Sequence, residues 1–230
     1  MSKLSNNSIE LTGMVINVMP VGEYDKRLTI FTKERGKISA FARGAKRQGS
    51  ALMGCSRIFA FGKFVLYEAR DYYSLQNAQI SNYFGDITED IEKTCYGTYF
   101  LELLNYYGRE AIRDVDSLKL IYMSLLALGK PAIPYRLTRR IFELRLMVIN
   151  GEYDSLPDTL KTDTGRYTWD YIIRSPIEKL YTFQIKEEVL SDIESSLDIM
   201  MKKYIDRDMN SLDILILYLR KIIRQTKIKL

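Results

Sequence analysis

The periodicity of the apolar residues changes near residue 85, and this change limits the chain to two kinds of structure in succession. Before it, short runs rich in Ile, Val, Phe and Tyr alternate with glycine and charged residues, which is the pattern of strands. After it, apolar residues recur every three to four positions, which is the pattern of helices. The expected strands are 9–19, 27–32, 37–42, 59–69 and 72–83, and the expected helices are 91–107, 118–128, 134–150, 190–204 and 212–223.

Five strands in so short a stretch, punctuated by glycine, are typical of a small β-barrel or sandwich. One hairpin is expected with Gly36 in its turn. The predicted fold class is therefore α+β, with a β-barrel domain over residues 1–84 followed by an all-helical domain over residues 85–230. Between 151 and 175 the helical pattern fails, and we expect an irregular insertion there with a small hairpin at 166–173.

The chain contains no histidine and only two cysteines, Cys55 and Cys95. The missing imidazole excludes Ser-His-Asp and Cys-His catalysis, and neither a four-Cys nor a mixed Cys/His zinc site can be assembled. No Walker A loop and no Gly-x-Gly-x-x-Gly motif occurs. The sequence therefore predicts no catalytic residue, no metal ion and no cofactor.

The N-terminus lacks the apolar core of a signal peptide. The longest uncharged apolar run, 120–129, is about half as long as a membrane span. We therefore expect a cytoplasmic protein without membrane contact, in which the two cysteines are reduced thiols.

Positive charge is concentrated in the first third of the chain. Residues 1–84 carry 12 Lys and Arg against 6 Asp and Glu, a net charge of +6, whereas residues 85–230 carry 22 against 23. Basic residues and glycines suit phosphates, because the side chains supply charge and glycine lets backbone N–H groups approach. A solvated basic hairpin explains the same pattern equally well. The predicted nucleic-acid-binding cations, which become the predicted DNA-binding residues under the family resemblance described below, are Lys26, Arg27, Lys33, Arg35, Lys37, Arg43, Lys46 and Arg47.

Aromatic rings on which bases stack are the second requirement of a single-strand binder. A barrel this small needs most of its rings in the core, so we expect only one or two to be exposed. The available rings are Phe31, Phe41, Phe59, Phe61, Phe64, Tyr67, Tyr72 and Tyr73.

A second candidate site lies on the expected helix 134–150, where arginines stand beside apolar residues. The simpler interpretation is an ordinary amphipathic helix. The alternative is a pocket for a peptide that carries a carboxylate and a hydrophobic side chain.

Four segments of the chain resemble the RecO family of bacterial DNA repair proteins, in the same order and at similar spacing from end to end. The first two are the more specific. They are TGMV at 12–15 followed by GEYDKRLTIFTKERGK at 22–37, ARGAKR at 42–47, FELRL at 142–146 with Gly151, Tyr153 and Pro157, and NSLDIL at 210–215.

The resemblance implies an N-terminal OB-fold followed by a helical domain. It implies a recombination mediator that binds single- and double-stranded DNA, anneals complementary strands, associates with the nucleoid during repair and acts with RecR to load RecA onto DNA covered by single-strand-binding protein. It also implies a pocket for the acidic, hydrophobic C-terminal tail of single-strand-binding protein. The residues that match this pocket here are Arg139, Arg140, Phe142 and Leu146.

The chain departs from the family at one place. Many RecO-like proteins carry a four-Cys zinc module just after the Phe-Glu-Leu helix, but residues 152–175 contain no cysteine. We therefore expect any remnant of that module to be metal-free. Two rival functions remain open on the sequence, namely a protein-interaction adaptor whose barrel binds a protein and an RNA-binding OB-fold module.

Overall fold

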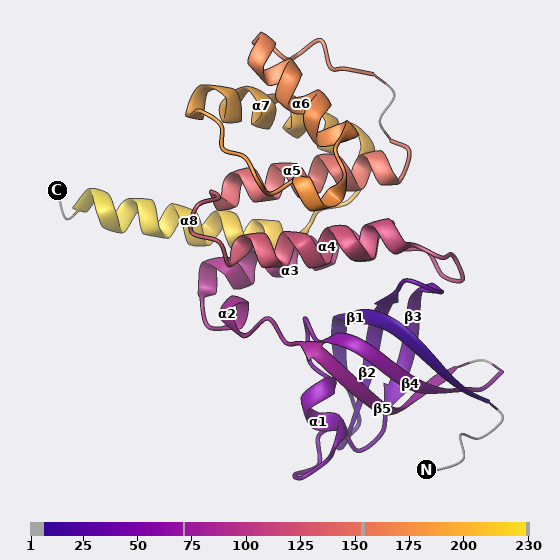
Figure 1. Cartoon of the computed structure of the whole chain (residues 1–230). Helices are drawn as coiled ribbons and strands as arrows, with labels where there is room; N and C mark the ends of the chain where they lie inside the picture. Colours follow the sequence, from indigo (N-terminus) through magenta and orange to yellow (C-terminus); the bar gives the residue numbers. More distant parts are fainter. Residues whose placement is uncertain (1–6, 71, 153–154, 229–230) are drawn as a thin grey trace. The chain divides into compact units, whose positions relative to one another are not determined.

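The computed structural model describes residues 7–70, 72–152 and 155–228, with side chains described up to Lys221. The chain divides into two units (Figure 1). The barrel unit comprises Met1–Gly85 and Asn105–Leu118, and the helical unit comprises Asp86–Leu104 and Lys119–Leu230. Each unit is described separately below.

The barrel unit is a closed barrel with strand order β1-β2-β3-β5-β4, in which β1 pairs with both β2 and β4. All pairings are antiparallel except that between β3 and β5, which is parallel. This topology is that of an OB-fold, and it confirms the α+β fold class. The elements are β1 (Ser8–Val21), β2 (Asp25–Thr32), β3 (Gly36–Ala42), the short helix α1 (Leu52–Cys55), β4 (Phe61–Glu68) and β5 (Tyr73–Asn82).

Alternation along β2 and β3 separates the core of the barrel from its outer face. Leu28 and Ile30 on β2, with Ile38 and Ala40 on β3, are buried in one hydrophobic cluster. Because successive side chains of a strand point to opposite faces, the intervening residues are left outside. The outer face of these two strands therefore carries Arg27, Thr29, Lys37, Ser39 and Phe41, while Phe31, which shares this face at the end of β2, is fully buried.

The segment 105–118, which begins in the last turn of α3 (Ile91–Tyr107), belongs to the barrel unit. The earlier residues of α3 belong to the helical unit. Its backbone pairs with the β2–β3 turn: the Lys37 amide donates to the Arg109 carbonyl at 2.9 Å, and the Asp114 amide donates to the Lys33 carbonyl at 3.1 Å. Gly36 forms an isolated β-bridge with Glu110. Glu110, which lies outside residues 1–84, is thus brought to the edge of the barrel.

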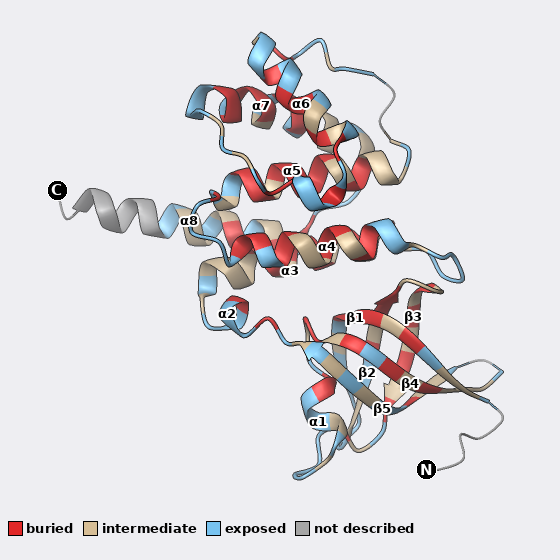
Figure 2. Cartoon of the chain, viewed as in Figure 1, coloured by how far each residue is buried: buried red, intermediate tan, exposed pale blue. Residues whose placement is uncertain are grey.

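The helical unit packs around α5, whose residues are buried on more than one side (Figure 2). Phe142 of α5 stacks on Phe100 of α3 with ring centroids 4.5 Å apart, and Arg140 pairs with Asp198 of α7. The remaining elements are α2 (Gly85–Thr88), α4 (Val115–Leu128), α5 (Tyr135–Ile149), α6 (Asp163–Arg174), a 3-10 turn (Ile177–Lys179), α7 (Glu187–Tyr204) and α8 (Asn210–Ile228). None of the described helices is long and apolar enough to cross a membrane.

The hairpin expected at 166–173 is wrong, because these residues form part of helix α6. The Thr162 side chain caps the helix by accepting from the Gly165 amide at 2.9 Å, and the Asp192 carboxylate accepts from the Thr162 amide at the same distance. Trp169 and Ile172 are fully buried. Residues 153 and 154 of the expected insertion lie outside the described residues. The described residues hold no group of three or more His, Cys, Asp or Glu that could bind a metal ion.

Gly36 is predicted to be essential for the docking of segment 105–118. Its φ is +58°, and a Cβ atom there would collide with the carbonyl oxygens of Arg109 and Ile112. Gly36→Ala should therefore lower the free energy of unfolding by about 3 kcal/mol, as measured by urea unfolding.

Gly49→Ala is the matched control, because Gly49 has φ +77° with no atom within 4 Å of the added Cβ. It should cost only about 1–2 kcal/mol, the penalty of the left-handed conformation alone. Equal losses in the two variants would contradict the close approach at Gly36.

Candidate nucleic-acid interface

The outer face of β2 and β3 is hollowed into a groove with basic and aromatic walls. Its main cavity has a volume of about 540 Å³, and a neighbouring cavity of about 280 Å³ shares Arg27, Lys37, Ser39 and Glu110 with it. We call all the residues that line these two cavities the β2–β3 groove. The main cavity is lined by Arg27, Arg35, Lys37, Ile38, Ser39, Glu68, Ala69, Arg70, Tyr72, Tyr73, Glu110 and Ala111.

Two of the groove arginines are held in place by hydrogen bonds. The Arg27 Nε donates to the Ser39 hydroxyl at 2.8 Å across the strand pair. Arg35 donates to the Tyr73 hydroxyl at 2.7 Å and to the Glu68 carboxylate. The hydrogen bond from Arg35 lowers the pKa of Glu68, so this carboxylate stays ionised and offsets part of the positive charge of the groove.

Tyr72 supplies an exposed ring to the groove. Its side chain is 41% exposed, and it meets Phe41 edge to face with ring centroids 6.2 Å apart. Phe31, Phe59 and Phe64 are fully buried, as expected of a small barrel. Tyr72 is thus the exposed ring among those that the sequence offered as stacking platforms.

A second basic surface lies where the β1–β2 turn meets the loop after β3. The Lys46 amide donates to the Tyr24 carbonyl at 2.9 Å, and the Arg47 guanidinium lies 4.9 Å from the centre of the Tyr24 ring. The Tyr24 ring is 43% exposed. We call the exposed residues Tyr24, Arg43, Lys46 and Arg47 the loop patch.

The structure distributes the eight predicted DNA-binding cations among four environments. Lys26 donates from Nζ to the Ser56 carbonyl at 2.9 Å, so it fastens the segment after α1 to the barrel, and Lys33 pairs with Glu34 at 3.7 Å. The other six lie in the β2–β3 groove (Arg27, Arg35 and Lys37) or in the loop patch (Arg43, Lys46 and Arg47).

Sequence reasoning missed three charged groove residues, Glu68, Arg70 and Glu110. Arg70 stands two residues before Tyr72, and a cation this close to a tyrosine in the sequence was a usable signal. Glu110 carries no comparable signal, because its place in the groove depends on the long-range bridge to Gly36.

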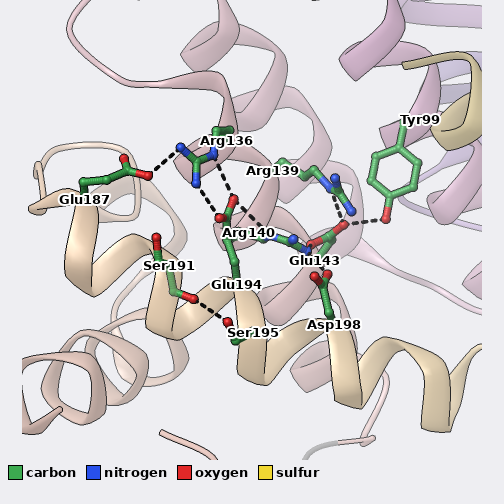
Figure 3. Close-up of polar contacts among 10 residues, drawn as sticks. All are labelled: Tyr99, Arg136, Arg139, Arg140, Glu143, Glu187, Ser191, Glu194, Ser195 and Asp198. Atoms are coloured by element: carbon green, nitrogen blue, oxygen red, sulfur yellow. Dashed lines mark hydrogen bonds and ion pairs between the residues drawn. The ribbon is translucent and has the colours of Figure 1, made fainter. Parts of the chain in front are cut away.

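In the helical unit, the predicted tail-binding arginines take part in a buried ionic cluster (Figure 3). Arg139 donates from Nε to Glu143 Oε1 at 2.7 Å, and Arg140 donates from Nη1 to Glu143 Oε2 at 2.9 Å. The Tyr99 hydroxyl donates to Glu143 Oε1 at 2.5 Å. Arg140 also lies 2.8 Å from a carboxylate oxygen of Asp198.

This arrangement leaves the predicted tail pocket without an open floor. Phe142 and Leu146 have no exposed surface, and Arg140 is only 5% exposed. The Arg139 side chain keeps 16% of its surface exposed. The structure brings the arginines together with carboxylates of the same unit, and the two predicted apolar residues of the pocket are fully buried.

The cluster keeps a fully buried glutamate ionised. Burial alone raises the pKa of Glu143, but Arg139, Arg140 and the Tyr99 hydroxyl more than offset it, so the pKa lies below its ordinary value of 4.5. Burial, together with the Glu143 charge, raises the pKa of Tyr99 well above 10. Removal of the Glu143 carboxylate would leave the buried charges of Arg139 and Arg140 without this partner, and removal of the arginines would leave the Glu143 carboxylate buried and uncompensated.

The fold and the groove define the class: this is an OB-fold protein whose β2–β3 face combines cations with an exposed ring, followed by a helical domain. The chain matches two family models, Recombination protein O N terminal over residues 6–84 and Recombination protein O C terminal over residues 88–158.

Curated relatives agree with both models. The chain is 27% identical over 240 residues to a DNA repair protein RecO of Acetivibrio thermocellus, covering 90% of this chain and 96% of the relative. It is 30% identical over 190 residues to that of Alkaliphilus metalliredigens, covering 80% and 77%. The chain belongs to the RecO family and is a recombination mediator of DNA repair.

Loss of the Glu143 charge should destabilise the protein in a pH-dependent way. Because the folded pKa of Glu143 is lowered, its stabilising contribution is present above pH 4.5 and is lost as the pH falls through the folded value. Glu143→Gln should lower the free energy of unfolding by about 3 kcal/mol at pH 7, by less as the pH approaches 3, as measured by urea unfolding.

Glu178→Gln is the matched control, because Glu178 pairs with Lys119 and also has a lowered pKa, but is exposed. It should change stability little at either pH. A Glu143→Gln loss that is the same at both pH values would contradict the ionised state of Glu143.

Proposed function

We propose that the chain binds single-stranded DNA in the β2–β3 groove and that the loop patch extends this binding to further phosphates. The observation that carries the proposal is the exposed Tyr72 ring beside Arg27, Arg35, Lys37 and Arg70 in one cavity. Aromatic faces accept any base, and arginines and lysines neutralise any phosphate, so the ring and these cations bind without sequence readout of their own.

Double-stranded DNA presents the same phosphates, and we propose that the loop patch contributes most to binding it. Its cations are exposed on a loop rather than sunk in a groove. A protein that holds two strands on cationic surfaces screens their mutual repulsion, which supports annealing of complementary strands without any bond chemistry. We therefore propose a non-enzymatic role in annealing and, with RecR, in loading RecA onto DNA coated with single-strand-binding protein.

Two rival functions lead to different observations. An adaptor whose barrel binds a protein would show no salt-dependent binding to oligonucleotides. An RNA-binding module would prefer RNA over DNA of the same sequence in competition, because only RNA offers a 2′-hydroxyl.

The β2–β3 groove should govern binding to single strands. Arg27→Ala and Tyr72→Ala are each expected to weaken binding of an unstructured oligonucleotide by about fivefold to a hundredfold, because a phosphate contact or a stacked base is lost. Arg27→Ala should also make the salt dependence shallower by about one unit of slope, whereas Tyr72→Ala should leave the slope unchanged. Fluorescence anisotropy at two salt concentrations measures both quantities.

Lys63→Ala is the matched control, because Lys63 is an exposed cation on β4 that pairs with Glu10 and lies outside both cavities. It should bind the oligonucleotide nearly as the wild type does.

The double variant Arg43→Glu, Lys46→Glu tests the loop patch. Its affinity for DNA of any sequence should be lower by tenfold or more. Undiminished binding in all the groove and loop variants would move the interface elsewhere.

We also propose that the helical unit binds the acidic tail of single-strand-binding protein, as the resemblance implied, with Arg139 as the contact. Arg139 is supported because it is the least buried of the four predicted residues. Arg139 forms an ion pair with Glu143, whereas Arg140 pairs with Glu143, Glu194 and Asp198 and is more deeply buried, so a tail carboxylate would have to displace more contacts at Arg140 than at Arg139.

Arg139→Ala should weaken binding of the tail peptide about tenfold to a hundredfold, the loss expected of one charge-assisted hydrogen bond. Binding to naked DNA should be unchanged. Arg136→Ala is the control, since Arg136 lies on the same helix and is also paired with glutamate, namely Glu187 and Glu194. Equal losses in the two variants, measured by calorimetry on samples of known melting temperature, would remove Arg139 from this role.

A further inference from the structure

Glu110 is a carboxylate that lies inside an otherwise cationic groove. It lines both cavities of the β2–β3 groove, in company with Arg27, Lys37 and Ser39. It arrives there from outside the first third of the chain, held by the bridge to Gly36 and by the hydrogen bond from the Lys37 amide to the Arg109 carbonyl. A carboxylate in this position repels any polyanion. Its presence in a groove that binds DNA therefore calls for a second role.

The cations of the groove do not neutralise Glu110. The Lys37 Nζ donates to the Asn105 carbonyl at 2.9 Å, Arg27 donates to Ser39, and Arg35 is paired with Glu68. Within the described part of the chain, Glu110 takes part in no ion pair. Its carboxylate oxygens are therefore available to a ligand.

The backbone beside Glu110 is fixed in a strained conformation. Ala111 also lines the main cavity and has a φ of +59°, a region that residues other than glycine seldom adopt. The bridge at Gly36 on one side and the Asp114 amide bonded to the Lys33 carbonyl on the other keep this short stretch in place. Glu110 is thus presented to the cavity by a fixed backbone.

A carboxylate repels phosphate and accepts hydrogen bonds, so the part of a nucleic acid that suits it is a base amino group. Cytosine carries such a donor at N4, and a carboxylate is a recognised acceptor for it, whereas thymine has a carbonyl oxygen at the equivalent position. Tyr72 lines the same cavity as Glu110, so a base stacked on that ring would have its edge within this cavity.

We propose that Glu110 is a specificity-determining residue of the β2–β3 groove, which accepts a hydrogen bond from the exocyclic amino group of a stacked base and disfavours thymine. The inference rests on the proposed binding of single strands in the groove. It goes beyond that proposal because cations and rings alone bind all bases alike.

The test compares oligonucleotides of deoxycytidine and thymidine of equal length, which share ring size and charge, against the full chain at one salt concentration and neutral pH. The wild type should bind the cytidine oligonucleotide about fivefold to tenfold more tightly. Glu110→Gln should bring this ratio close to one, because the amide offers both a donor and an acceptor. It should also tighten binding of both oligonucleotides, because a negative charge leaves the groove.

Glu10→Gln is the matched control. Glu10 is an exposed glutamate of the same unit, it pairs with Lys63, and its replacement changes the net charge by the same amount. The cytidine-to-thymidine ratio should stay at its wild-type value in this variant. A ratio near one in the wild type, or an undiminished ratio in Glu110→Gln, would overturn the inference while leaving the binding itself intact. If neither oligonucleotide binds in a salt-dependent way, the proposed function fails and the inference fails with it.

Discussion

The alternation of buried and outward-facing side chains, along β2 from Arg27 to Ile30 and along the whole of β3, is the constraint on which the candidate interface depends. Leu28, Ile30, Ile38 and Ala40 fill the barrel, and this fixes which residues face outward. A slip of one residue in the pairing would move the outward-facing cations into the core, where their charge could not be accommodated. The paired register of β2 and β3 therefore specifies both the stability of the barrel and the position of Arg27 and Lys37 on its surface.

In the helical unit the corresponding constraint is the charge of Glu143. A fully buried carboxylate is costly unless several donors satisfy it, and here Tyr99, Arg139 and Arg140 supply them from α3 and α5 (Figure 3). Asp198 of α7 then balances Arg140. The cluster therefore links three helices through polar contacts whose partners depend on one another, which accounts for the buried charges of Arg140 and Glu143 in the middle of helix α5.

Local signals in the sequence were sufficient for the barrel and for most of the helices. The expected strands correspond to β1–β5, and the hairpin with Gly36 in its turn is present, because period-two alternation and turn glycines are local properties. Helix α6 was missed because its threonines and aromatics weaken the helical signal, although Gly165, Thr168, Trp169 and Ile172 follow the helical period.

The two candidate sites show what local signals cannot supply. Eight cations were predicted to bind DNA, but one of them, Lys26, donates to Ser56 within the unit. Arg140, Phe142 and Leu146 were expected beside an open pocket, yet helix α5 is covered on several sides, and sequence periodicity does not show how many faces a helix buries. Glu110 reaches the groove through a bridge to a residue more than seventy positions away. Such contacts are set by the tertiary fold.

Photocrosslinking tests most directly whether the β2–β3 groove is where single strands lie. A short oligonucleotide carrying one halogenated cytosine would be bound to the full chain, irradiated, and its attachment point mapped by mass spectrometry. The account predicts that the major crosslink falls on the segment around Tyr72, the exposed ring of the groove. A major crosslink on β4 near Lys63, or within the helical unit, would contradict it.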